Sequence, residues 1–201
     1  EVNPKKTSNS KLAELMVGRS VNLKTRRNKI KPGDALLEVK NLTVLSEKKE
    51  TAISNISLKL HQKEILGVAG VQGNGQTEFI EALTGLRKIS SGNISYFHKN
   101  CTNMSPRQIH KIGIRHIPED RQRQGLVNEF SIIENTVLNT YYEKDFSENI
   151  SLNWNKAKSE ATRVMKKFDV RASSETTPAK NLSGGNQQKL VIGREMSRKI
   201  N

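Results

Sequence analysis

A glycine-rich segment at residues 70–77 has the composition of a phosphate-binding loop. Its residues are, in order, Gly70, Val71, Gln72, Gly73, Asn74, Gly75, Gln76 and Thr77. Glycines at this spacing allow backbone N–H groups to turn inward around phosphate oxygens, and the start of a following helix adds the positive end of a dipole. Thr77 offers a hydroxyl that suits Mg²⁺ as a weak ligand. The segment predicts a nucleotide site made of Gly70, Gly73, Asn74, Gly75, Gln76 and Thr77.

The loop departs at one position from the P-loop pattern GxxxxGK[ST]. Gln76 stands where the pattern has lysine. That lysine reaches the β- and γ-phosphates and neutralises charge there. Glutamine donates a hydrogen bond but carries no charge, so we expect nucleotide binding without efficient phosphoryl transfer. On the loop alone, an ordinary strand-to-helix turn stays an open alternative.

A second segment with anion-binding composition lies near the C-terminal end of the chain. It comprises Leu182, Ser183, Gly184, Gly185, Asn186, Gln187, Gln188 and Lys189. The two glycines permit close backbone approach, and a helix is expected immediately afterwards, with its periodic part from about Asn186. This arrangement presents free N–H groups and a positive helix end to an anion. Serine is also a common helix N-cap, but two adjacent glycines are less usual for a cap alone.

The elements around these segments predict an α/β protein. Apolar and polar residues alternate at 37–39 and 56–60, which favours strands with one buried face. The continuous apolar run 65–69 is typical of a strand covered on both faces, as in a parallel sheet. Further strands are expected at 93–97 and 112–117, and helical spacing recurs at 79–86, 132–138 and 157–168. We expect a nucleotide-binding core at 34–125, a helical subdomain at 126–175, and the glycine-containing segment with its helix at 176–201.

Composition limits the possible environments of the chain. Its single cysteine, Cys101, excludes an internal disulfide and fits a reducing compartment. The net charge is +14, and residues 1–33 hold nine Lys or Arg against Glu1 and Glu14. Such a basic segment could contact nucleic acid or an anionic membrane surface, or could be a solvated linker. The chain starts without Met and stops directly after a helical pattern, so a fragment of a longer protein is expected.

The string LSGGNQQK at 182–189 resembles the signature motif of the ABC ATPases, in the variant found in the second cassette of tandem-cassette sugar and nucleoside importers. The strings GVAGV at 67–71, EALTGL at 81–86 and PEDR at 118–121 support this resemblance. Residues 15–19 resemble the tail of a first cassette, which makes 1–33 an inter-cassette linker. The implied fold is a P-loop cassette with an N-terminal antiparallel β part, a core parallel sheet and a helical subdomain.

The resemblance also assigns roles to residues. Leu182, Ser183, Gly184, Gly185, Asn186 and Gln187 would contact, in trans, an ATP held by another cassette. Glu119 would be the counterpart of the Q-loop glutamine, although a plain charged turn at Glu119, Asp120 and Arg121 stays possible. The Walker B carboxylates and switch histidine that the family requires beyond the signature helix have no counterpart in this sequence. We therefore expect no catalytic residue in the chain and no ATP hydrolysis by the chain alone.

The implied function is that of the ATP-binding subunit of an importer for a sugar or a nucleoside, with ATP and Mg²⁺ as cofactors. The implied partners are the first cassette of the same subunit or a second copy, transmembrane permease subunits, and indirectly a periplasmic or lipoprotein solute-binding protein, without nucleic acid. The implied location is the cytoplasmic face of the inner (plasma) membrane, as a peripheral protein. An alternative is a non-transport ABC ATPase acting on nucleic acid or the ribosome, which the net charge favours. That alternative lacks interleaved aromatics for base stacking, and these motifs do not select the solute.

Overall fold

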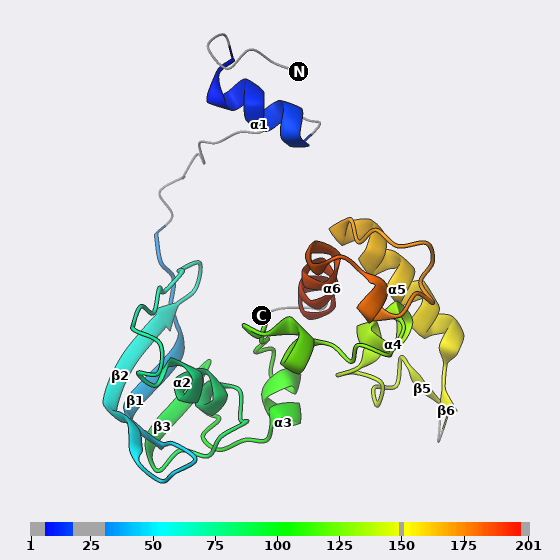
Figure 1. Cartoon of the computed structure of the whole chain (residues 1–201). Coiled ribbons are helices and arrows are strands. Elements are labelled where there is room, and N and C mark those ends of the chain that lie inside the picture. Colours follow the sequence, from blue (N-terminus) through cyan, green and yellow to red (C-terminus); the bar gives the residue numbers. More distant parts are fainter. Residues whose placement is uncertain (1–6, 18–30, 149–150, 198–201) are drawn as a thin grey trace.

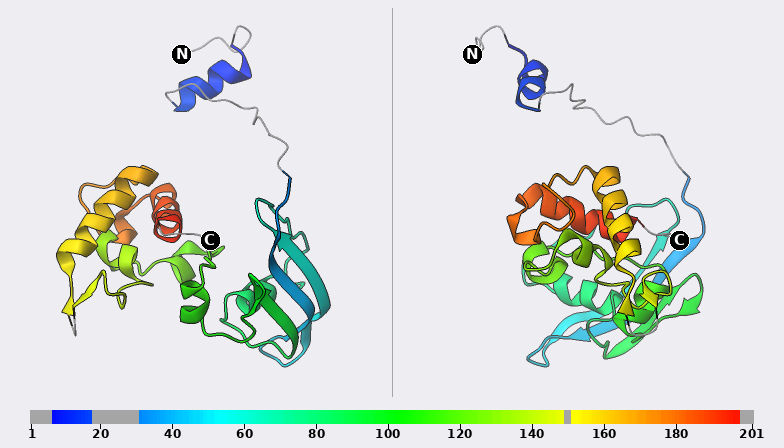
Figure 2. Two further views of the ribbon diagram at one scale, coloured as in Figure 1. Left: turned by 180° about the vertical axis from the view of Figure 1, so that it is seen from behind. Right: turned by 90° about the vertical axis from the view of Figure 1, so that its right-hand side faces the viewer.

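The computed structural model describes residues 7–17, 31–148 and 151–197. Within them, a β-sheet and a group of helices form two separate hydrophobic cores (Figures 1 and 2). One core draws on residues between 39 and 109 and the other on residues between 126 and 191. Helix α1 (Asn9–Val17) is drawn apart from both in Figure 1. Most of the linker expected at 1–33 lies outside the described residues.

The sheet has four antiparallel strands in the order β2-β1-β3-β4. Their bounds are Ala35–Leu45 for β1, Thr51–His61 for β2, Ser91–Tyr96 for β3 and Lys99–Asn100 for β4. Val39 pairs with Leu58 on one side and Ile94 on the other. A register shift between Val39 and Leu42, with Asn41 at φ 50°, keeps both apolar side chains buried although they are three residues apart. This sheet is the antiparallel part that the family resemblance implied.

The predicted core parallel sheet does not form among the described residues, which corrects that expectation. Residues 65–70 and 114–118 have no regular secondary structure, and every recorded strand pair is antiparallel. A strand exists only where a neighbouring strand takes up its N–H and C=O groups, and no strand of the described residues pairs with these two segments. Their apolar side chains are consequently uncovered, with Ile65 97% and Val68 57% exposed.

Helix α2 (Gln76–Leu83) covers the sheet through Phe79 and Ala82, which are buried in the same cluster as Val44 and Ile53. A connecting region then leads to the helical group. It contains α3 (Pro106–Lys111), started by a capping box of Ser105 and Gln108, and η2 (Arg121–Gly125), a short π-helical turn. The Asp120 side chain caps η2 by accepting hydrogen bonds from the N–H groups of Gln122 and Arg123.

The helical group consists of α4 (Ile132–Val137), α5 (Trp154–Phe168) and α6 (Gly184–Met196). The short hairpin β5 (Ser147–Glu148) and β6 (Ser151–Leu152) precedes α5, and the 3₁₀ turn η3 (Ala179–Asn181) precedes α6. Ala157, Ala161 and Val164 of α5 are fully buried against Leu190 and Val191 of α6. No helix within the described ranges combines the length and apolar character that a membrane crossing needs.

A glycine sets how closely α5 and α6 approach. A Cβ on Gly193 would lie 2.6 Å from Cγ1 of Val164 and 3.1 Å from Cδ2 of Phe168. Gly185, in the first turn of the same helix, has no atom within 4 Å of such a Cβ. We expect Gly193→Val to lower the free energy of unfolding by about 1–3 kcal/mol through overpacking, and Gly185→Val to change it far less. Urea unfolding followed by circular dichroism would measure both. Equal losses would contradict the packing described here.

Candidate functional site

The glycine-rich loop ends where α2 begins, as the sequence predicted. Gly73 and Gly75 have φ values of 88° and 91°, in the left-handed region that favours glycine. A Cβ on Gly75 would lie 2.5 Å from the carbonyl oxygen of Ala52, so only glycine fits under strand β2. Gly75 is the N-cap of α2, and Gln76 is its first residue. The first-turn N–H groups of α2 are therefore next to the loop, as anion binding requires.

The side chain of Gln76 folds back over its own loop. Its Nε2 donates to the carbonyl oxygen of Val71 at 3.1 Å, and it would lie only 2.0 Å from a Cβ on Gly70. The amide thus satisfies a loop carbonyl and brings no positive charge to the space in front of α2. The loop geometry fits a phosphate group, but the residue at the lysine position does not supply the charge that phosphoryl transfer uses.

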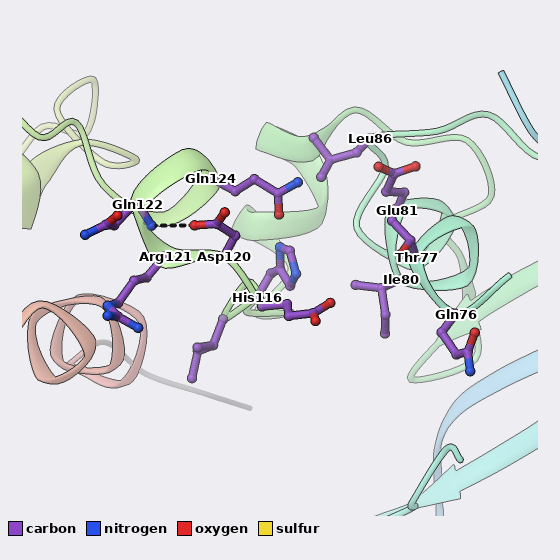
Figure 3. A pocket seen from close by; sticks show the side chains of 12 residues that line it. Gln76, Thr77, Ile80, Glu81, Leu86, His116, Asp120, Arg121, Gln122 and Gln124 are labelled. Carbon is purple, nitrogen blue, oxygen red and sulfur yellow. Dashed lines mark hydrogen bonds between the residues drawn. The ribbon is translucent and has the colours of Figure 1, made fainter. Parts of the chain in front are cut away.

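A cleft of about 770 Å³ connects α2 with the segment 116–124 (Figure 3). Gln76, Thr77 and Glu81 line one side, and Glu119 and Asp120 line the other. The structure therefore brings the loop-proximal hydroxyl of Thr77 and the carboxylate of Glu119 to one cavity, although they are 42 positions apart in the sequence.

His116 also lines the cleft, although the sequence analysis did not single it out. Burial lowers the pKa of His116, and the negative charge of Glu195 partly opposes that shift. The imidazole is therefore mostly neutral near pH 7. The sequence signal that could have found it is its position within the predicted strand just before Pro118.

The second glycine-containing segment forms the start of α6. Ser183 is the N-cap, and its Oγ accepts a hydrogen bond from the N–H of Asn186 at 3.4 Å. Both glycines belong to the first helical turn, so α6 begins two residues earlier than expected. Ser183 and Gly185 are exposed, whereas the side chains of Leu182 and Gln187 are buried. Gln187 donates through Nε2 to the carbonyl oxygen of Ala179 at 3.0 Å, which holds the segment in place.

Arg121 stands over the start of α6. Its Nη2 would lie 2.7 Å from a Cβ on Gly184, and its Nε donates to Oε1 of Gln187 at 3.3 Å. Gln122 donates to the same oxygen at 3.3 Å. In Figure 3 the Arg121 side chain points from η2 toward α6. A guanidinium at the positive end of a helix makes this surface strongly favourable for anions. The sequence grouped Arg121 with a charged turn and carried no signal for this contact.

The two anion-binding segments are not brought together within one chain. None of the residues 182–187 lines the cleft that Gln76 and Thr77 line. The loop belongs to the sheet core, and the Ser183 segment belongs to the helical core. The structure therefore does not place the two segments in one cavity.

A glycine loop at the start of a helix, a second glycine-capped helix and an antiparallel sheet beside a helical group define a P-loop nucleotide-binding cassette. Residues 53–201 match the sequence profile of the family described as ABC transporter, and the chain belongs to this family.

Relatives and solved structures agree with this assignment. The chain is 46% identical to the nucleoside import ATP-binding protein NupA of Lactococcus lactis subsp. cremoris, covering 95% of this chain and 38% of the relative. It is 44% identical to the guanosine import ATP-binding protein NupO of Bacillus subtilis, covering 96% and 38%. It is 37% identical to the ribose import ATP-binding protein RbsA of Halalkalibacterium halodurans, covering 94% and 36%. The chain thus spans 38% or less of the length of these three relatives.

A nucleotide-free ATP-binding cassette from an ABC transporter superposes with a TM-score of 0.63 at 19% identity, covering 81% of this chain and 65% of that one. A dimeric structure of a post-hydrolysis state of the cassette MJ0796, bound to ADP and Pi, superposes with a TM-score of 0.61 at 19% identity, covering 81% and 69%. Both superpositions establish the α/β fold of the cassette.

A buried arginine of α6 joins this helix to the end of η2 and forms an ion pair with its own neighbour in the sequence. Arg194 donates to Oε1 of Glu195 at 2.9 Å and to the carbonyl oxygen of Gly125 at 2.8 Å. Arg194→Met leaves the Glu195 carboxylate buried without its cation, so we expect a loss of about 3–5 kcal/mol in unfolding free energy. Lys180→Met, which breaks an exposed pair with Glu129, should cost less than about 1 kcal/mol. Urea unfolding of the two variants would check this, and similar losses would refute the anchoring role.

Proposed function

We propose that this chain is part of the ATP-binding subunit of an ABC importer and acts as its second cassette, coupling ATP binding and hydrolysis to uptake of a nucleoside or a sugar. The observation that carries the proposal is the start of α6. Ser183 and Gly185 are exposed there beside the Arg121 guanidinium, away from the chain's own loop. Relatives that match more than nine-tenths of the chain are named as nucleoside, guanosine and ribose import ATP-binding proteins, which supports this class of solute.

In this proposal the signature segment works in trans. Ser183, Gly184 and Gly185 present hydroxyl and N–H donors to the triphosphate of an ATP held by another cassette, either the first cassette of the same subunit or a second copy. Leu182 and Gln187 hold that segment from inside the protein, since both side chains are buried. The chain's own loop, formed by Gly70, Gly73, Asn74, Gly75 and Gln76, holds a second nucleotide with less charge compensation.

Mg²⁺ would supply charge neutralisation to the nucleotide at the loop, and Thr77 is the residue that would contact it. Thr77 lines the cleft at the first turn of α2, so its hydroxyl fits a hard, oxygen-preferring cation. The acidic side chains of Glu81, Glu119 and Asp120 line the same cleft. Arg121 lines it too, and Glu81 is paired with Arg87, so the cleft carries charges of both signs.

The segment with Glu119 is proposed to be the Q-loop counterpart facing the permease. It lines the cleft on one side, and through Arg121 and Gln122 it contacts Gln187 of α6 on the other. Permease subunits would dock on the helical subdomain at 126–175, with the solute-binding protein acting through the permease. The assembly would place this chain at the cytoplasmic face of the inner (plasma) membrane as a peripheral component.

Substitutions at the two segments should have unequal effects on transport. Ser183→Trp fills the space in front of α6 and should abolish uptake by the full-length subunit assembled with its permease. Gln76→Ala removes only an internal hydrogen bond to Val71 and should leave most of the uptake. Uptake of radiolabelled guanosine and ribose into proteoliposomes would measure both effects. Equal loss from the two substitutions would defeat the asymmetric arrangement.

The chain by itself should not hydrolyse ATP. Its loop lacks the lysine charge, and the sequence has no counterpart of the Walker B glutamate. Phosphate release by the purified 201-residue chain should equal that of its Thr77→Ala variant. Turnover that depends on Thr77 would contradict this expectation.

A further inference from the structure

The Asn186 side chain bridges the turn after α5 and the N-cap of α6. Its Oδ1 accepts a hydrogen bond from the backbone N–H of Arg171 at 3.0 Å. Its Nδ2 donates to Oγ of Ser183 at 3.0 Å, and its backbone N–H reaches the same oxygen at 3.4 Å. Two of these three hydrogen bonds of Asn186 therefore go to the hydroxyl oxygen of Ser183.

The orientation of this amide is fixed by chemistry. A backbone N–H is only a donor, so the group that faces Arg171 must be the carbonyl oxygen of the Asn186 side chain. The NH₂ group then has to face Ser183. An amide turned the other way would place two donors against each other at Arg171.

This orientation determines what Ser183 can do. A serine hydroxyl has one proton to donate and two lone pairs that accept. Asn186 occupies both acceptor positions, through its side chain and its backbone. Within the described part of the chain no acceptor is recorded for the Ser183 proton, and the residue is exposed. The hydroxyl is thus held as a donor directed away from the helix.

We infer that Asn186 is a positioning residue that keeps the Ser183 hydroxyl proton directed at a triphosphate oxygen of the ATP held by the partner cassette. This inference rests on the proposed function. Phosphate oxygens accept hydrogen bonds and do not donate them at neutral pH, so a serine held as a donor is matched to that ligand. A freely rotating serine would have to be oriented at each binding event.

The turn that holds Asn186 is itself fixed from α6. Asp169, the C-cap of α5, has a left-handed backbone with φ 52°. Lys189, one turn beyond Asn186, donates to the Asp169 carbonyl at 2.7 Å and to its carboxylate at 2.8 Å. The hydrogen bond from Lys189 to the Asp169 carboxylate, followed by one from the Arg171 guanidinium to the same carboxylate, lowers the pKa of Asp169. Asn186 and Lys189 therefore hold the same turn, but only Asn186 also contacts Ser183.

A double-mutant cycle separates positioning from support of the fold. ATP hydrolysis would be measured for the full-length subunit assembled with its permease, comparing wild type, Ser183→Ala, Asn186→Ala and the double variant. Asn186→Ala alone should lower kcat/KM by roughly tenfold, the size of one hydrogen bond to a charged group. In the Ser183→Ala background the same change should have less than about a twofold effect, because no hydroxyl remains to be oriented.

Two further variants make the test sharper. Asn186→Asp keeps the shape but accepts the Ser183 proton and adds negative charge, so it should be more damaging than Asn186→Ala. Lys189→Met loosens the same turn without touching Ser183 and should lower kcat/KM clearly less than Asn186→Ala does. A loss from Lys189→Met as large as that from Asn186→Ala would overturn the inference, because the effect would then come from the turn.

The possible failures are distinguishable. If Ser183→Ala leaves hydrolysis unchanged, the proposed contact of the signature segment with ATP is wrong. If Ser183→Ala lowers hydrolysis but Asn186→Ala costs the same factor with and without the hydroxyl, the proposed function stands and the positioning role of Asn186 is wrong.

Discussion

The arrangement of the described chain depends on the hydrogen-bond requirements of one buried guanidinium. Arg194 is only 8% exposed, and a buried cation is tolerated only where its N–H groups find acceptors. It finds them in the Glu195 carboxylate and in the carbonyl oxygens of Gly125 and Asn135. These acceptors belong to α6, to the end of η2 and to α4. Satisfying Arg194 therefore fixes α6 against both other segments at once.

Near the N-terminal end of α6, the side-chain amide of Gln187 likewise connects the helix to neighbouring segments. Gln187 donates to Ala179 and accepts from Arg121 and Gln122, so its side chain connects η3 with η2. Both ends of the signature helix are thus tied to the turn 121–125, whose other side lines the cleft with Thr77. In the proposed importer, a displacement of this turn would reach both ends of α6 through direct side-chain contacts. The two hydrophobic cores need not deform for that to happen.

Local sequence signals predicted the local features correctly. The helix starts at Gln76 and near Ser183 follow from glycine and N-cap chemistry, and alternation at 37–39 and 56–60 predicted strands where β1 and β2 lie. Features that depend on distant partners were missed. The apolar run at 65–69 is typical of a buried strand. Whether it forms one depends on neighbouring strands that can pair with it, and the sequence of the run does not specify those strands. Arg121 lies 66 positions before Gln187, and no periodicity in the sequence predicts the hydrogen bond between the two side chains.

The type of a side chain predicts its charge and its hydrogen-bonding groups, but it does not predict which partner the side chain contacts. That Gln76 brings no charge follows from its type, whereas its hydrogen bond to Val71 requires the folded loop. Similarly, Asn186 was expected beside a nucleotide, but its fixed amide orientation depends on the N–H of Arg171 fifteen residues earlier. The sequence thus proposed candidate residues, and the tertiary contacts determine which atoms those residues present.

The N-termini of α2 and α6 differ in the charges around them, and this difference supports unequal roles for the two segments in nucleotide binding. At α6 the helix dipole is reinforced by the Arg121 guanidinium, so both terms attract an anion. At α2 the dipole and the loop N–H groups attract an anion, but Gln76 is neutral and Glu78 stands in the first turn, while Arg121 lies on the lining of the neighbouring cleft. Glu81, Glu119 and Asp120 line the cleft beside that turn, and the pKa of His116 is lowered, which keeps its ring uncharged there. The charges around the two helix starts therefore differ, and this difference supports unequal roles for the two segments in the proposed cassette pair.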